Sequence, residues 1–187
     1  MVMPRCRAAL FLLAATTLGC VEIDTDARES SEPNAIASEN GHSGYVLKYG
    51  EGENSSPPGG GHYITKASPR TGTQGAVMFY DEETPGETSG VHYHTQADEF
   101  FYVVQGRGTI TLGGQDTVIE AGDTIVVLVG EDHRITSSED DPLRVVYFLD
   151  RAGLEEQFRL KLDRGSMTLE EFNAIVKEFG TVYKSFE

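Results

Sequence analysis

Residues 86–106 read GETSGVHYHTQADEFFYVVQG, and this stretch decides the fold and the chemistry together. His92 and His94 are two residues apart, so on a β-strand both imidazoles point to the same face. Glu99 follows a short polar shift of the chain, opens the next strand and faces the same interior. Imidazole nitrogens and carboxylate oxygens are common ligands of divalent metal ions. The stretch therefore predicts a metal site on two neighbouring strands.

A second stretch, GDTIVVLVGEDH at residues 122–133, adds one further imidazole after a bend at Gly130. A lone histidine on a strand is most often a hydrogen-bonded polar residue. Here three of the five histidines fall in the joint pattern, which predicts that His92, His94, Glu99 and His133 surround one ion. The set suits Fe(II), Mn(II), Ni(II), Co(II), Cu(II) or Zn(II), with one or two coordination positions left open.

The chain around these stretches alternates apolar and polar residues with a period of two from Tyr45 to Asp150. Gly and Pro separate the runs, and Gly113-Gly114 marks a tight hairpin. The predicted strands are residues 45–49, 62–67, 75–81, 91–95, 99–105, 107–112, 115–120, 124–129, 132–137 and 143–150. The pattern is typical of an all-β sandwich or barrel, and residues 54–61 read as a loop.

The C-terminal segment, residues 153–187, has a helical period instead. Thr168 and Glu171 form a capping box, and Gly180 can end the helix that they open. Leu154, Phe158 and Leu160 predict a second helix over about 153–162. These one or two helices are expected to pack on the barrel, and a lid over a pocket mouth is the alternative.

The first nineteen residues read as a signal peptide, with Arg5 and Arg7 before an apolar run that is too short to span a membrane. Thr17-Leu18-Gly19-Cys20 resembles a bacterial lipobox, although Thr17 replaces the usual Leu. Cys20 would then carry the lipid. Ordinary secretion with cleavage near Ala14 or Ala15 is the alternative. Both interpretations predict export, either to the cell envelope as a lipid-anchored protein or as a secreted protein.

The composition excludes some partners. The net charge is −15 over 187 residues and becomes −17 without Arg5 and Arg7, which argues against nucleic acid and against direct binding to an anionic membrane. We expect contact with a membrane only through the lipid anchor. Residues 20–44 are acidic and polar, contain His42, and read as a flexible tether. His62 opens a predicted strand and is a weak candidate for the pocket.

The two stretches together resemble the two motifs of the cupin superfamily, with Leu128 in place of the usual Pro and Ser137 in place of the usual Asn. The resemblance implies a double-stranded β-helix, or jelly-roll, barrel of six to eight strands, which we place at residues 45–152. It also implies that His92, His94, Glu99 and His133 are the metal ligands. The tail at 167–180 is similar to single-domain cupins described as quercetinase-like, and homodimers are expected by resemblance.

Three functions follow as hypotheses. The leading one is a metal-dependent dioxygenase acting on a small, partly aromatic molecule, with Glu99 as a ligand that also accepts a proton. Phe101, Val103 and Tyr147 are the pocket candidates, and simple core packing is the alternative for each. The second hypothesis is a binding module for a small ligand or a metal. The third is an isomerase or lyase for a sugar or keto acid, which would need a proton-shuttling pair that the sequence does not reveal.

Overall fold

The computed structural model describes residues 34–36, 44–55, 62–160, 162 and 164–187. The predicted signal peptide, Cys20, His42 and most of the predicted tether lie outside the described residues. Within the tether region, β1 (Asn34–Ile36) pairs antiparallel with β2 (Gly44–Val46), a short ribbon that the composition did not predict. No helix in the described ranges combines the length and the apolar character needed to cross a membrane.

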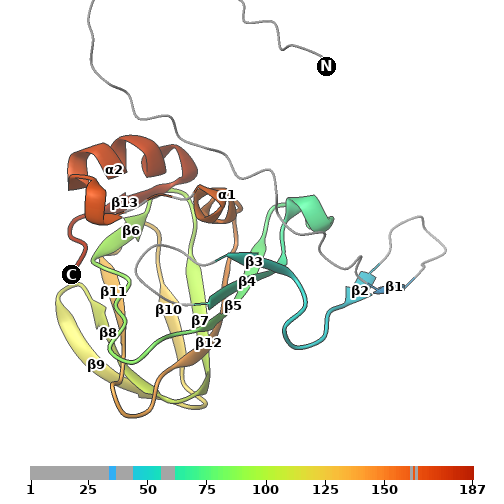
Figure 1. The fold of residues 1–187 in the computed structure, drawn as a ribbon, viewed down its shortest axis with the longest axis horizontal. Helices are drawn as coiled ribbons and strands as arrows, with labels where there is room; N and C mark the ends of the chain where they lie inside the picture. The colour runs from blue at the N-terminus through green and yellow to red at the C-terminus, as the bar shows by residue number, and fades with distance from the viewer. Residues whose placement is uncertain (1–33, 37–43, 56–61, 161, 163) are drawn as a thin grey trace, which may run out of the picture.

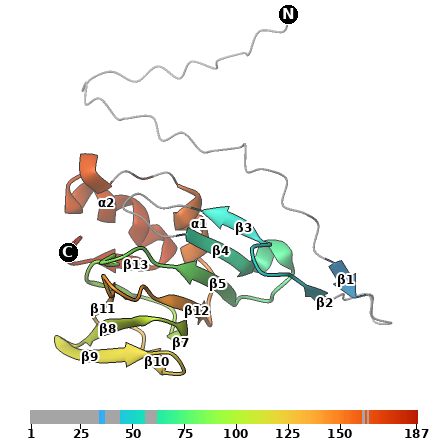
Figure 2. The same cartoon turned by 60° about the horizontal axis from the view of Figure 1, so that its bottom comes forward.

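Two antiparallel sheets lie face to face and form the barrel (Figures 1 and 2). One sheet has the order β10 (Thr124–Val127), β7 (Glu99–Gln105), β12 (Arg144–Leu149), β5 (Val77–Glu82), β4 (His62–Ala67) and β3 (Glu53–Ser55). The other has the order β13 (Thr181–Tyr183), β6 (His92–His94), β11 (His133–Ser137), β8 (Arg107–Leu112) and β9 (Gln115–Glu120). The architecture confirms the predicted all-β jelly-roll barrel.

Alternation predicted the long strands well, because one face of each strand is buried. Strands β4, β7, β8 and β9 have the predicted bounds. For the other predicted barrel strands, the observed first and last residues lie within two residues of the predicted ones. The short strands β3 and β13 were missed. Three residues are too few to show a period. Strand β13 pairs with the distant β6, and β3 pairs with β4 across a loop. Strand β2 was predicted, but it pairs only with β1 and lies outside the two barrel sheets.

The inner face of the larger sheet carries three rows of side chains across β5, β12 and β7. In register these rows are Val77, Leu149 and Glu99; then Phe79, Tyr147 and Phe101; then Asp81, Val145 and Val103. The middle row is aromatic, and its rings stack with centroids 4.8 and 5.4 Å apart. Cross-strand rings at this spacing stabilise a sheet beyond the burial of their area. The row also separates Glu99 from Asp81 along the barrel.

The C-terminal segment forms two helices at one end of the barrel (Figures 1 and 2). Helix α1 (Leu154–Arg159) is shorter than the predicted 153–162. Helix α2 (Leu169–Val176) begins with the predicted capping box of Thr168 and Glu171, and a 3-10 turn then leads to Gly180 at φ +87°. Phe172 and Val176 pack with Tyr183 of β13 in a small core of their own, so this segment is joined to the barrel through β13.

The outer face of the larger sheet exposes an apolar strip. Its exposed members are Met78, Tyr102, Val104, Val126 and Phe148, and the rings of Phe100 and Phe148 stack along it. Exposed apolar area of this kind often marks a contact surface. The homodimer expected from the resemblance stays a prediction.

Candidate metal centre and pocket

His92, His94, Glu99 and His133 meet at one point inside the barrel, and all four are buried. One ligand atom from each lies within 4.8 Å of the others. Oε2 of Glu99 is 3.1 Å from Nε2 of His94 and 3.0 Å from Nε2 of His133. The side chains come from β6, β7 and β11, so the two sequence stretches that carry the motif converge as the spacing predicted.

Pairing on both sides of β6 positions the imidazoles. On one side His92 is in register with His133 of β11, and on the other side β13 places Tyr183 beside His92 and Thr181 beside His94. The bend before β11 is fixed by Gly130, whose φ of +82° favours glycine and whose N–H donates to the His94 carbonyl at 2.8 Å. The turn is therefore tied directly to a ligand strand.

Hydrogen bonds to the far nitrogen orient each ring. Nδ1 of His92 lies 3.0 Å from the Gly90 carbonyl oxygen, and Nδ1 of His133 lies 3.1 Å from that of Glu131. Nδ1 of His94 lies 3.2 Å from the hydroxyl oxygen of Thr181. A proton held on Nδ1 leaves the Nε2 lone pair free, which is the usual arrangement around a metal-binding histidine.

The protonation states also suit a metal. Burial and the neighbouring His133 and His94 lower the pKa of His92 well below its usual value, so the ring is neutral. Burial alone would raise the pKa of the Glu99 carboxyl, but His94 and His133 beside it hold that pKa well below its usual range. Nε2 of His133 is buried, and the Glu99 carboxylate is the group 3.0 Å from it. Burial alone would lower the pKa of His133, but the carboxylate of Glu99 gives that pKa a net rise. Three imidazoles in their neutral form and one carboxylate are a ligand set that fits a divalent ion.

Thr181 and Tyr183 are site residues that sequence reasoning missed. The Tyr183 ring stacks on the His92 ring with centroids 4.9 Å apart, and Thr181 is fully buried against His94. Neither residue belongs to a spacing pattern, since both reach the site only when β13 pairs with β6. The C-terminal segment thus supports the ligands as well as covering the barrel.

Thr181→Val will weaken metal binding roughly 10- to 100-fold, because it removes the hydrogen-bond partner of the His94 ring. The exposed Thr117→Val on β9 is the matched control and should leave the affinity unchanged. Competition with a chromogenic chelator measures both affinities. Equal metal affinity in the two variants would show that the Thr181 hydroxyl does not support the ligand.

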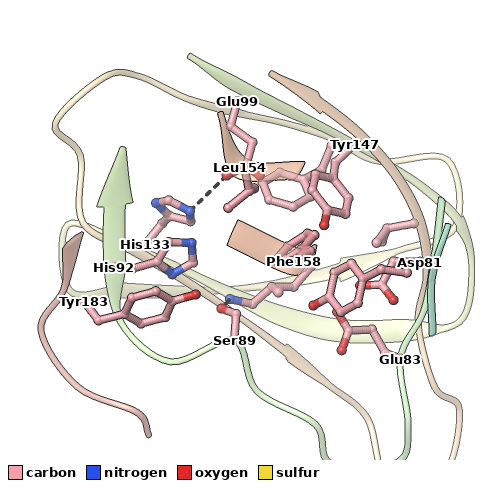
Figure 3. Close-up of a pocket in the computed structure, with 14 residues that line it drawn as sticks. Asp81, Glu83, Ser89, His92, Glu99, His133, Tyr147, Leu154, Phe158 and Tyr183 are labelled. Atoms are coloured by element: carbon pink, nitrogen blue, oxygen red, sulfur yellow. Dashed lines mark hydrogen bonds and ion pairs between the residues drawn. The ribbon is translucent and has the colours of Figure 1, made fainter. Parts of the chain in front are cut away.

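A pocket begins at the metal ligands and runs into the barrel (Figure 3). Its empty volume, open solvent at the mouth included, is about 480 Å³. Phe101 and Tyr147 line it, as predicted for pocket residues, but Val103 does not. Val103 is one row further along β7, where it is fully buried among core side chains. His62 also lies outside the pocket, half-exposed beside Glu82.

The C-terminal segment completes the pocket wall. Leu154 and Phe158 of α1 and Tyr183 of β13 line it, and the Phe158 ring packs on Tyr63 with centroids 4.8 Å apart. The same packing of the C-terminal segment therefore covers the end of the barrel and forms part of the pocket wall. Aromatic rings on several sides suit a flat, partly aromatic ligand.

A pair of buried carboxyl groups lies across the pocket from the metal ligands (Figure 3). Asp81 is 1% exposed and Glu83 is 7% exposed. Burial and the neighbouring carboxylate of Glu87 raise the pKa of Asp81 to about 7, and burial beside Asp81 raises the pKa of Glu83. Sequence reasoning found no such pair. The signal was the acidic run at 81–83, in which Asp81 lies on the inner face of β5 and Glu83 follows directly after the strand.

Comparison with known proteins agrees with this geometry. Residues 80–149 match the family model described as a cupin domain. The barrel has the cupin fold. The polyketide cyclase RemF from Streptomyces resistomycificus superposes with a TM-score of 0.51 over 57% of this chain and 78% of that chain, at 17% identity. A likeness at this identity shows the fold alone.

Two similar proteins carry names from polyketide biosynthesis. Tetracenomycin polyketide synthase protein TcmJ of Streptomyces glaucescens is 29% identical over 76 residues, which are 41% of this chain and 51% of that protein. Polyketide synthase CurC of Streptomyces cyaneus is 32% identical over 91 residues, which are 48% and 59%. The cupin matches thus span between half and three fifths of each relative.

Proposed function

We propose that this cupin is a metal-dependent enzyme that acts on a small, partly aromatic molecule bearing an oxygen atom. The observation that carries the proposal is the position of the ligand cluster, which forms one wall of a pocket whose other walls include Phe101, Tyr147 and Phe158. A divalent ion bound by the cluster would supply a Lewis acid with an open position for an oxygen atom. The rings would orient the rest of the molecule and exclude water.

Two reaction classes fit this arrangement. A dioxygenase needs an open position on a redox-active metal beside a ring compound, and the buried Glu99 carboxylate could take up a proton during the reaction. A redox-neutral reaction, such as a cyclisation, dehydration or isomerisation, needs only a Lewis acid and groups that move protons. The names of two similar proteins connect them to polyketide synthases, which is compatible with a partly aromatic substrate that bears oxygen. Both classes share the metal site and the pocket.

Turnover with and without dioxygen separates the two classes. The mature protein, loaded in turn with Fe(II), Mn(II), Ni(II), Co(II), Cu(II) and Zn(II), is incubated with a panel of phenols, flavonols and aromatic polyketones. Consumption of substrate together with dioxygen supports the oxygenase. Consumption in strict anaerobiosis supports the redox-neutral reaction. A molecule that binds tightly and is recovered unchanged under every condition would instead identify a binding module.

We also infer export with a lipid on Cys20, which the signal-like sequence of residues 1–19 supports. In a bacterial host, Cys20→Ser should move the protein from the membrane fraction to the soluble periplasmic fraction and abolish labelling by a fatty-acid analogue. Cys6→Ser is the control, since Cys6 would be removed with the signal. Unchanged fractionation of the Cys20 variant would indicate ordinary secretion or retention.

A further inference from the structure

The two carboxyl groups of Asp81 and Glu83 form a site separate from the metal ligands. Asp81 lies on the inner face of β5, in register with Val145 of β12 and Tyr63 of β4, and Glu83 follows directly after the end of that strand and is also buried. The Glu83 and Tyr63 side chains and the backbone of His62 lie close enough to Asp81 to lower its pKa, against the larger effect of burial. Both carboxyl groups line the pocket that begins at His92, Glu99 and His133.

Within the part of the chain that the structure describes, no ion pair offsets the cost of burying these two carboxyl groups. None of the groups that shift the pKa of either carboxyl is a cation, and the charged groups nearby, Glu87 included, are acidic. Two adjacent carboxylates cannot both remain ionised in such a place, so the pair retains a proton near neutral pH. One buried oxygen, Oδ1 of Asp81, makes no hydrogen bond among the described residues. An acidic pair kept at this cost points to a chemical role.

The hydrogen bonds assign different roles to the two groups. The polar groups of the Tyr63 side chain and the His62 backbone near Asp81 favour its ionised form. Glu83 has Asp81 as its one hydrogen-bonding neighbour among the groups that affect its pKa, which favours the protonated form. Asp81 is therefore arranged as a base and Glu83 as an acid, and their mutual hydrogen bond can return the proton after a reaction.

We propose that Asp81 and Glu83 are a catalytic acid–base pair for a molecule held at its other end by the metal centre. This inference rests on the proposed function and narrows its substrate to a carbonyl or phenolic compound with an acidic C–H bond and a hydroxyl leaving group. In register, Asp81 and Glu99 are two strands and four residues apart, so their Cα atoms are separated by roughly 16 Å. A molecule that reaches both ends is longer than a single ring.

The chemical step is a redox-neutral dehydration. Ionised Asp81 takes the proton as the C–H bond breaks, and the electron pair of that bond becomes the new C=C bond. The C–O bond breaks, and the leaving oxygen takes the proton of Glu83 and departs as water. Asp81 is then protonated and Glu83 ionised, and transfer of one proton between them restores the starting state. No oxidant or reductant is required.

Infrared spectroscopy tests the shared proton without any substrate. The metal-loaded protein in D₂O near neutral pH should show the C=O band of a protonated carboxylic acid, and Glu83→Gln should remove it. Glu82→Gln is the matched control, because Glu82 lies between the two groups on the same strand but faces outward. Absence of the band in the unmodified protein, or its persistence in both Glu83→Gln and Asp81→Asn, would overturn the proposal.

Hydrogen–deuterium exchange tests the chemistry with a defined two-ring probe, 4′-(3,4-dihydroxyphenyl)acetophenone. Its catechol oxygens can bind a metal, and the acidic methyl C–H bonds are on the far ring. Exchange at the methyl group, followed by NMR, should fall about 100-fold or more in Asp81→Asn and within twofold in Glu82→Gln. Binding of the probe is followed separately by the visible spectrum of the Co(II)-loaded protein. A probe that leaves the spectrum unchanged counts against the proposed function. A probe that perturbs it but exchanges equally in Asp81→Asn counts against the acid–base pair alone.

Discussion

His92→Ala will reduce the metal content of the purified protein to below about a tenth of the wild-type value, whichever metal the protein carries. The substitution removes one of four ligand atoms that lie within 4.8 Å of one another. It also removes the ring against which Tyr183 stacks, so the pairing of β13 is loosened as well. Elemental analysis of both proteins after identical purification measures the effect, and turnover should fall in parallel.

His62→Ala is the control for this experiment, because His62 is a half-exposed histidine outside the cluster. Its metal content should equal that of the wild type. Circular dichroism and a thermal melt show whether His92→Ala still folds. A folded His92→Ala protein with wild-type metal content would mean that the ion is bound elsewhere, and the functional proposal would then lose its basis.

The stability of the protein will fall as the pH rises from about 4 to 7, and Asp81→Asn will remove most of this fall. Burial raises the pKa of Asp81 from 3.8 to about 7 in the folded chain. Between these values the folded state holds a proton that the unfolded state has released, so the free energy of unfolding decreases with increasing pH. Above the folded pKa the dependence levels off. The stability contributed by the neutral carboxyl is fully present below the unfolded pKa.

The fall in the free energy of unfolding that Asp81 causes should be about 2 to 4 kcal/mol. Each unit of pKa shift corresponds to about 1.4 kcal/mol, and Asp81 and Glu83 titrate as a coupled pair, so the shift belongs to both groups. Urea denaturation of wild type and Asp81→Asn at pH 5 and pH 8, with both proteins in the same metal state, measures it. The stability of Asp81→Asn relative to wild type should be greater at pH 8. The exposed Asp140→Asn should show no such change. An Asp81→Asn effect of the same size at both pH values would contradict the raised pKa.

The two predictions probe opposite ends of one pocket. His92 belongs to the end where three imidazoles and one carboxylate gather around one point, and Asp81 belongs to the end where two carboxyl groups share a proton. The aromatic row of Phe79, Tyr147 and Phe101 lies between them. A substrate that spans the pocket would contact a Lewis acid, a set of rings and a proton donor in sequence, which is the reason for preferring chemistry over simple binding.

The sequence by itself determined the barrel strands and the four candidate ligands. Alternation is a local property, so the bounds of β7 and β8 and the shared face of His92 and His94 could be predicted without tertiary information. The capping box of α2 was equally local. Motif spacing then related Glu99 and His133 to the two histidines, because each stretch reaches the barrel interior by a short, regular path.

Only the tertiary structure decided what surrounds those ligands. Thr181 and Tyr183 reach His94 and His92 through pairing of a three-residue strand about ninety positions away in the chain, and no local period records that pairing. In the sequence, Asp81 and Glu83 are only two members of an acidic run, and their burial depends on the closed barrel. Burial, and with it the pKa of a side chain, depends on neighbours contributed by the whole fold, which is why the ligands could be predicted and the acid–base pair could not.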